Sequence, residues 1–465
     1  MTEVSGPARS SPAKNSSSLP QPAKLSLWPL VIATFFMVSG GTYGTEEIVH
    51  GAGYSRAILI LILTPLLWSL PTAYMVGELS SAIPAEGGYY AWVRRGMGNF
   101  WGFQEAWLSL VASIFDMAIY PALFIAYLTH LFPWFARNGR GTVVGIVVVV
   151  ACAVLNIAGV RVVAATSLWL FAALSAPFVL VCVLAPLRHG ALAGAAHPSG
   201  STVGLLGGIL IAMWNYMGWD SASTIAAEVD RPQRIYPRAI LLAVLLVSLT
   251  YIIPVAAVAV TGLPPGAWET GSWADIAGMV GGNWLRVALV CGGLFSAFGM
   301  LNALVMSYSR LPLAMAQDGM LPPVFARVHP RTGAPWVAIL VCAIGWGACV
   351  GLDLERLVTI DILLTGSSVL LEFAALVALR YREPELPRPF RVPGGITGAW
   401  LAGACPMLLL TLAAVHGQHE TIFGVSALAV GVLLIVAGVV IYWLSALVRP
   451  DGWMVPARQP TSEMD

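Results

Sequence analysis

Six acidic residues lie within long apolar stretches of this sequence, where charged side chains are rare. An intramembrane charge costs about 2.5–3.5 kcal/mol on insertion scales, so acids at such depth usually line a functional path. No Lys or Arg lies in the middle of any of these stretches, so the chain itself supplies no base there. Protons, a cationic substrate, or both in turn would have to neutralise the acids. They are Glu46, Glu47, Asp116, Asp220, Asp361 and Glu372.

The spacing of these acids puts several of them on common helix faces. Glu372 follows Asp361 by 11 residues, about three helical turns, and Thr365 and Ser368 fall on the same face. We expect this face to point into a helix bundle, where separated carboxylates suit a flexible diamine or polyamine. A second stripe, at offsets of four and eleven, consists of Asp116, Tyr120 and Tyr127.

Two apolar stretches are interrupted in the middle, beside some of these acids. The stretch 27–49 is broken by residues 39–44 (SGGTYG), and the stretch 204–228 by residues 215–218 (NYMG). Lipid offers no hydrogen bonds, so irregular backbone at membrane depth is tolerated only where it lines a cavity. Paired broken helices in corresponding places of two halves indicate the binding site of a transporter.

Aromatic residues surround the second break and offer cation–π contacts to a bound amine. These residues are Trp214, Tyr216 and Trp219. A structural alternative exists for Glu46, Glu47 and Asp220, because acids in the first turn of a half-helix are stabilised by capping and by the helix dipole. Since Glu46 and Glu47 point about 100° apart, only one of them is expected to face a cavity.

The composition is that of an integral membrane protein. Hydrophobic residues make up 58% and charged residues 10% of the chain, whereas soluble domains carry about 25% charged residues. The net charge of +1 gives no reason to expect nucleic acid as a partner. The six cysteines form no CxxC pair, so we expect neither a disulfide framework nor a metal site.

The apolar stretches predict twelve spanning helices, because a span needs about 20 mostly apolar residues. Residues 1–25 are expected to form a disordered tail, without a cleavable signal peptide, and residues 448–465 a second tail. The spans are expected at 27–52, 56–81, 99–133, 141–159, 162–187, 204–228, 236–262, 284–311, 335–351, 355–380, 396–415 and 421–447.

The basic residues predict the orientation of these spans. If both termini are cytoplasmic, 18 of the 24 Lys and Arg residues lie on the cytoplasmic side. This bias obeys the positive-inside rule. We therefore predict a multi-pass protein of the cell membrane (a plasma or inner membrane) with both termini in the cytoplasm.

Three segments together resemble the amino acid–polyamine–organocation transporters. They are residues 77–90 (GELSSAIPAEGGYY), 228–239 (EVDRPQRIYPRA), and 314–322 (AMAQDGMLP) with 332–335 (TGAP). The resemblance covers roughly residues 26–447. It implies the all-α LeuT-type fold, with a transporter core over 26–395 made of two inverted five-helix repeats and with discontinuous helices 1 and 6. Residues 396–447 would add helices 11 and 12.

Within that family, the chain looks most like the polyamine uptake branch. The residues that carry this likeness are 38–41 (VSGG) with Glu46, 101–105 (WGFQE), Asp116 with 118–121 (AIYP), 219–221 (WDS) and 371–373 (LEF). The branch has Glu-Asp where this chain has Glu46 and Glu47, and residues 296–309 match less well.

We therefore expect a secondary active transporter that moves polyamines or related cationic amines by alternating access. Protons are preferred to sodium as the coupling ion, because buried acids can exchange protons. Ser296 would nevertheless offer a hydroxyl to sodium, and the fifth span lacks the lysine that some family members use for coupling.

Two other functions stay open: a permease for neutral or zwitterionic amino acids, and a membrane receptor that binds a solute without moving it. If the substrate is an amino acid, its carboxylate would meet the beginnings of the two half-helices, at Gly44 and at Trp219. No enzyme and no cofactor are expected, because no nucleophile–base pair or metal-ligand spacing occurs at a plausible site.

The candidate site combines the two breaks with the acids and aromatics beside them. Glu46, Asp116 and Glu372 are also the candidates for carrying a coupling proton, and no metal is expected. The candidate substrate-binding residues are Ser39, Gly40, Gly41, Thr42, Tyr43, Glu46, Asp116, Tyr120, Trp214, Asn215, Tyr216, Trp219, Asp220, Asp361 and Glu372.

Overall fold

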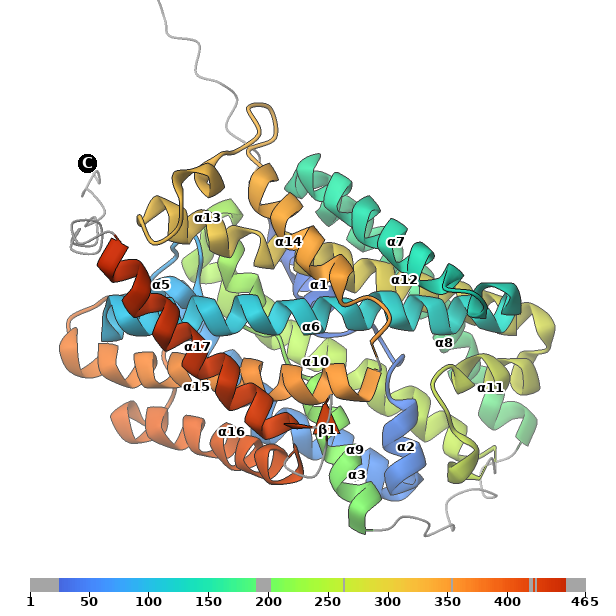
Figure 1. Cartoon of the computed structure of the whole chain (residues 1–465). Helices are drawn as coiled ribbons and strands as arrows, with labels where there is room; N and C mark the ends of the chain where they lie inside the picture. Colours follow the sequence, from blue (N-terminus) through green and yellow to red (C-terminus); the bar gives the residue numbers. More distant parts are fainter. Residues whose placement is uncertain are drawn as a thin grey trace, which may run out of the picture.

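The computed structural model describes residues 25–189, 202–261, 264–352, 354–417, 421–422 and 425–448 (Figure 1). The two expected tails lie outside these ranges, apart from Leu25 and Val448. The α-helices are α1 (Leu27–Val38), α2 (Glu46–Ala52), α3 (Tyr54–Thr64), α4 (Leu70–Ala82), α5 (Tyr89–Met97), α6 (Asn99–Leu131), α7 (Arg140–Ile157), α8 (Val160–His189), α9 (Thr202–Asn215), α10 (Pro232–Ala259), α11 (Ser272–Gly281), α12 (Asn283–Tyr308), α13 (Arg310–Gln317), α14 (Trp336–Ala348), α15 (Leu354–Arg382), α16 (Gly395–Gly417) and α17 (Ala427–Val448).

Short elements connect these helices. A π-helical turn, η1 (Pro65–Ser69), joins α3 to α4, so that Tyr54–Ala82 forms one long helical segment. The 3-10 helices are η2 (Pro133–Ala136), η3 (Ser221–Glu228), η4 (Pro265–Ala267) and η5 (Pro323–Ala326), and a two-stranded antiparallel hairpin consists of β1 (Thr421–Ile422) and β2 (Val425–Ser426).

The helices have the lengths and compositions of a multi-pass membrane protein. In the described part of the chain, 9 helical segments are long and apolar enough to cross a membrane. Three shorter apolar helices, Leu27–Val38, Leu205–Asn215 and Trp336–Ala348, lie where the first, sixth and ninth spans were expected. The all-α membrane fold is therefore confirmed, whereas the total of twelve spans and the inverted repeat stay predictions.

Both expected helix breaks are present. The helix α1 ends at Val38 and α2 begins at Glu46, while α9 ends at Asn215 and η3 begins at Ser221. Glycines in the left-handed region occur in both gaps, at Gly41, Gly44 and Gly218. A side chain strains such a conformation, which explains why glycine occupies these positions.

The two breaks pack directly against each other. The Asn215 side-chain amide donates a hydrogen bond to the Gly44 carbonyl over 3.1 Å. A Cβ atom on Gly218 would lie only 2.6 Å from the Met37 carbonyl oxygen. Backbone of the first break therefore lies against backbone of the second, which leaves no room there for a side chain.

The long helices α6, α12 and α15 form the inner part of the bundle. Figure 1 shows α6 and α15 running side by side across the molecule, and the two helices are in extensive contact. In the apolar segment of each helix, 67% of the residues are buried inside the protein for α6 and for α15, but only 17% for α17. Polar residues on α6 and α15 therefore face protein rather than the outside of the bundle.

Ion pairs gather at one end of the bundle, which we call the basic end. There Glu78 is fully buried and pairs with Arg380 at 2.5 Å and with Arg388 at 3.3 Å. Two more pairs, Arg94–Asp318 and Arg310–Glu228, lie at the same end. These acids have fixed partners, because a buried charge without a partner is costly.

The contact between the two breaks yields a stability prediction. Gly218→Ala should lower the free energy of unfolding by about 1–2 kcal/mol or more, because the methyl group clashes with the Met37 carbonyl and φ is +92°. Titration of the purified protein with sodium dodecyl sulfate measures this change. Gly347→Ala in α14 is the control, since its Cβ meets no atom within 4 Å. Equal unfolding midpoints for both variants would contradict the described contact.

Candidate functional site

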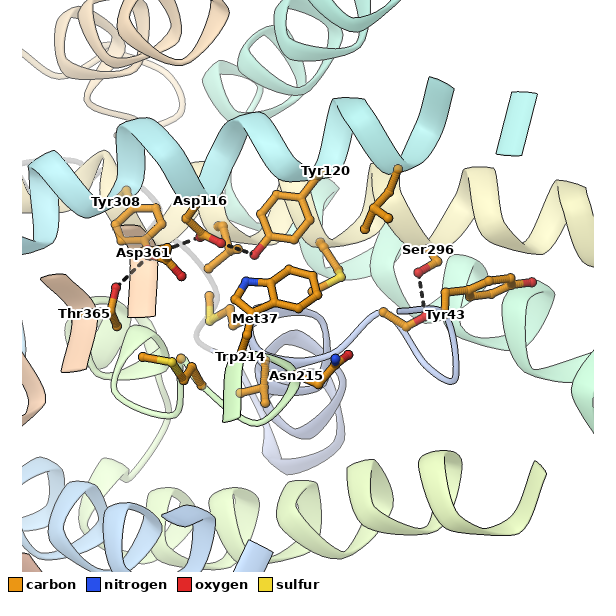
Figure 2. Close-up of a pocket in the computed structure, with 17 residues that line it drawn as sticks. Met37, Tyr43, Asp116, Tyr120, Trp214, Asn215, Ser296, Tyr308, Asp361 and Thr365 are labelled. Atoms are coloured by element: carbon orange, nitrogen blue, oxygen red, sulfur yellow. Dashed lines mark hydrogen bonds between the residues drawn. The ribbon is translucent and has the colours of Figure 1, made fainter. Parts of the chain in front are cut away.

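A central cavity lies between the two helix breaks and the inner helices (Figure 2). Its volume in this conformation is about 30 Å³. The broken helices contribute Met37, Val38, Gly40, Tyr43, Trp214, Asn215, Met217 and Gly218 to its lining, and the inner helices contribute Asp116, Tyr120, Leu123, Ser296, Met300, Leu304, Tyr308, Asp361 and Thr365.

Asp116 on α6 is buried and accepts hydrogen bonds from two phenols. The Tyr120 hydroxyl donates to its Oδ1 atom over 2.7 Å, and the Tyr308 hydroxyl donates to its Oδ2 atom over 3.3 Å. Tyr120 lies one helical turn after Asp116, so the first of these bonds follows from their spacing on α6. Both phenols are neutral donors, and they orient the carboxylate without cancelling its charge.

Asp361 on α15 is the second acid of the cavity. The Thr365 hydroxyl, one turn further along the same helix, donates to its Oδ1 atom over 2.8 Å. Asp361 lies close enough to Asp116 for their charges to interact. The ion pairs formed by arginines in the described part of the chain involve neither of these acids. A positively charged guest would therefore relieve the repulsion between the two.

The cavity also has aromatic and backbone walls. Figure 2 shows the Trp214 indole in the middle of the site, with Asp116 and Tyr120 beside it and Asn215 below. Indole and phenol faces attract cations. Two convergent carboxylates among aromatic and apolar side chains suit an ammonium group and the methylene chain that carries it, and the cavity would have to widen from its present volume to admit both.

Seven of the predicted binding residues line this cavity, and they come from four different elements or breaks. They are Gly40, Tyr43, Asp116, Tyr120, Trp214, Asn215 and Asp361. The expected stripe on α15 does face the interior, but only Asp361 and Thr365 of that stripe line the cavity.

Glu46 lies outside the central cavity and has three hydrogen-bond donors. The Gly44 amide donates to its Oε2 atom over 2.7 Å, while the Gly271 amide, at 3.2 Å, and the Tyr127 hydroxyl donate to Oε1. Glu46 therefore has a structural role, as the sequence left open, but it bonds to the first break and to Gly271 rather than capping α2. Glu47 points elsewhere and accepts a bond from the Thr270 hydroxyl over 2.8 Å.

A second cavity, on the α2 side of the central one, contains both of these acids. Glu46, Glu47 and Thr270 contribute to its lining. Leu123 and Trp214 line this cavity and the central one, so their side chains separate the two spaces. The expectation that only one of Glu46 and Glu47 faces a cavity is therefore wrong: the 7-residue helix α2 lines this second cavity with both side chains.

The remaining predicted residues of the first break serve its backbone. The Gly41 amide donates to the Ser39 hydroxyl oxygen over 3.0 Å, and the Thr42 hydroxyl donates to the Thr250 carbonyl over 2.7 Å. Ser39, Gly41 and Thr42 do not line the central cavity. They hold the irregular segment in place between α8 and α10.

Tyr216 and Trp219 are packed away from the central cavity in this conformation. The Tyr216 hydroxyl donates to the Leu61 carbonyl over 2.9 Å, and its ring meets that of Tyr251 edge to face. Trp219 is fully buried. The aromatic surface offered to a cation comes instead from Trp214, Tyr120 and Tyr308.

Asp220 and Glu372 lie together in a separate buried cluster. Glu372 is within electrostatic range of Asp220 and of Glu105, and all three are buried. They do not line the central cavity. One oxygen of Glu105 accepts hydrogen bonds from the Ser109 and Ser368 hydroxyls.

One face of α12 was missed by reasoning from the sequence as a binding surface. Ser296, Met300, Leu304 and Tyr308 all line the cavity. They recur at every fourth position, which is the spacing of one helix face. This spacing, which begins at the Ser296 hydroxyl and ends at the Tyr308 phenol, is the sequence signal that could have identified the face. The Ser296 hydroxyl donates to the Gly40 carbonyl.

The side chains of the site favour an organic cation over a metal ion. Among the described residues, no three His, Cys, Asp or Glu side chains are arranged to hold a metal ion. Two carboxylates at hydrogen-bonding positions, with aromatic and methionine side chains around them, match an alkylammonium group better.

Comparison with known proteins gives consistent results. Residues 31–446 match the family described as "Amino acid permease". The polyamine transporter RMV1 of Arabidopsis thaliana is 34% identical over 459 residues, covering 97% of this chain and 90% of the relative. The polyamine transporter PUT1 of Oryza sativa subsp. japonica is 33% identical over 443 residues, covering 92% and 81%. An uncharacterized transporter of Mycobacterium tuberculosis is 30% identical over 320 residues, covering 67% and 70%.

The hydrogen bonds that Glu46 accepts yield a second prediction. Glu46→Gln should lower the free energy of unfolding by about 1.5–3 kcal/mol, because one of the donors now bonded to the carboxylate would face the amide NH2 group. The change is measured by detergent titration. Glu47→Gln is the matched neighbour and should cost less, since the Thr270 hydroxyl can still donate to an amide oxygen. A Glu46→Gln variant as stable as the wild type would contradict the structural role of these hydrogen bonds.

Proposed function

The chain belongs to the amino acid permease family, and we propose from this that it is a membrane transporter, not an enzyme, that moves polyamines or related cationic amines by alternating access through its central cavity. The observation that carries the proposal is the pair Asp116 and Asp361, which share a buried aromatic cavity without a paired arginine or lysine among the described residues. The relatives whose names include polyamine transport support the same substrate class.

A substrate with its own carboxylate fits this geometry less well. In transporters with broken helices, the N-terminal ends of the half-helices contact anionic groups of the substrate. Here the Gly44 amide, which lies just before α2, already donates to the chain's own Glu46. The central cavity adds two further acids, which repel a carboxylate. Transport of amino acids is therefore the second candidate, and it rests on the family description alone.

The proposed cycle uses the elements already described. One ammonium group of the substrate would lie between Asp116 and Asp361, with Trp214 against its methylene chain. The broken helices would then move against α6, α12 and α15 and expose the cavity to one side of the membrane at a time. Coupling to protons rather than sodium is part of the proposal, with Glu46, Asp116 and Glu372 as the first candidates.

The membrane and the orientation are also proposed. The excess of basic residues on one side supports a cell membrane location with both termini in the cytoplasm. The basic end of the bundle, with Arg94, Arg310, Arg380 and Arg388, would then face the cytoplasm.

Uptake of radiolabelled putrescine and spermidine into proteoliposomes tests the proposal. Asp116→Asn and Asp361→Asn should each weaken putrescine binding by about tenfold or more, because a neutral amide loses a charge-assisted contact worth about 1.5–3 kcal/mol. Asp275→Asn is the matched control, since Asp275 pairs with Arg286 at the protein surface. Uptake of amino acids that polyamines do not inhibit would refute the proposal.

A further inference from the structure

A second group of acids lies on the same two helices as the cavity acids, at a different depth. Glu105 and Asp116 are eleven residues apart on α6, as Asp361 and Glu372 are on α15. Eleven residues correspond to about 16 Å along a helix axis. Because α6 and α15 are in contact, each helix provides one acid to an upper level, Asp116 with Asp361, and one to a lower level, Glu105 with Glu372.

Asp220 completes the lower level from the second helix break. It immediately precedes η3, and its charge acts on both Glu372 and Glu105. It also acts on Asp361 above. The lower level therefore holds three carboxyl groups from three separate elements. We call Glu105, Asp220 and Glu372 the lower cluster.

Several polar atoms around the lower cluster are buried and have no hydrogen-bond partner within the described chain. Both carboxyl oxygens of Glu372 are among them, as are Oε2 of Glu105 and Oδ1 of Asp220. The Tyr89 phenol, which is 1% exposed, is also without such a partner and lies within electrostatic range of all three acids. A neutral donor and three carboxyl groups thus converge on one place.

The segment 77–90, which was first noted for its resemblance to a transporter family, positions Tyr89 beside the lower cluster. Gly88 has a positive φ, and a Cβ atom on it would lie 2.0 Å from the Ser223 hydroxyl oxygen. The chain can therefore pass directly against η3 just before α5 begins. Tyr89, the first residue of α5, enters the space between η3, α6 and α15.

The charged groups near the lower cluster do not neutralise it. Arg94, Arg310 and Arg380 pair with Asp318, Glu228 and Glu78 at the basic end. The other bases on the surrounding helices are engaged elsewhere or far along the chain: Arg95 pairs with Glu383, Arg286 pairs with Asp275, and Arg382 donates to the Gly96 carbonyl. His130 on α6 and Arg356 on α15 lie beyond Asp116 and Asp361, 25 and 16 residues from Glu105 and Glu372. Three buried carboxylates without a base are incompatible with a closed bundle unless they bind cations or protons.

Of the three coupling candidates only Glu372 belongs to the lower cluster, and we propose that this cluster, rather than Glu46 or Asp116, is the binding site for the coupling proton, separate from the upper level that binds the substrate amine. This inference rests on the proposed transport of cationic amines. Protons suit the lower cluster because they need no additional space, and a carboxylate with unpartnered oxygens accepts one directly. The metal-ion alternative has no support, because the three acids are not arranged as a metal site among the described residues.

The location of Asp220 on the broken helix links protonation to movement. With protons bound, Asp220 at the start of η3 can stay near Glu105 and Glu372, as it does here, while η3 itself packs against α1 and α12. When the protons leave, Asp220 is repelled by Glu105 and Glu372, and the second helix break moves away from these two acids. Closure of the bundle therefore requires an amine at the upper level and protons at the lower level, so the two are carried together.

Glu105→Gln and Glu372→Gln test this, because each amide imitates a carboxyl group that never loses its proton. In proteoliposomes, both variants should bind putrescine within about threefold of the wild type and exchange it across the membrane at equal pH. Accumulation driven by an inside-alkaline pH gradient should fall by about tenfold or more, which corresponds to a loss of about 1.4 kcal/mol or more of coupling. Glu372→Asp, which still titrates, should keep part of the accumulation.

Glu383→Gln is the matched control, since Glu383 follows the same helix α15 but pairs with Arg95 at the surface. Undiminished gradient-driven accumulation in both Gln variants would overturn the proton assignment. So would a selective loss of spermidine binding, which would make the lower cluster a site for a second ammonium group. A wild-type protein that neither binds nor exchanges putrescine would instead refute the proposed function.

Discussion

The structure depends on carboxyl groups that are buried without a fixed base. At the basic end, Glu78 has two arginine partners and Glu228 has one. In the middle of the bundle, Asp116 and Asp361 have only neutral donors. An unpaired buried charge is equally costly at both places. Asp116 and Asp361 must therefore be neutralised by a mobile cation or proton. A bundle of this kind closes readily only when cations or protons are bound.

The second constraint is the hydrogen bonding of irregular backbone. Ser39, Thr42 and Glu46 bond to main-chain groups of the first break or its surroundings, and Asn215 bonds to the Gly44 carbonyl from the second break. Many polar groups of the two breaks therefore form hydrogen bonds within the protein. The substrate meets mainly side chains from α6, α12 and α15, while the breaks supply close packing and the ability to move.

The sequence predicted the acids and the breaks because both are costly in lipid and stand out against an apolar background. It did not predict which side chains turn toward the cavity near the second break. Gly218 has a positive φ, so the helical register that places Trp214 does not continue to Trp219. The α12 face was missed for another reason: Met300 and Leu304 are ordinary apolar residues of a long span, and only the contact with the breaks distinguishes their side of the helix.

The two acid levels show how one electrostatic constraint can link a binding site to a movement. The residues Glu105, Asp116, Asp361 and Glu372 belong to the inner helices, whereas Asp220 belongs to a broken one. Since the charge of Asp220 acts on Asp361 above it and on Glu105 and Glu372 beside it, a change of charge at either level alters the force on η3. No continuous path of moving side chains is needed between the levels. The coupling follows from placing one mobile acid between two sets of immobile ones in a medium of low dielectric constant.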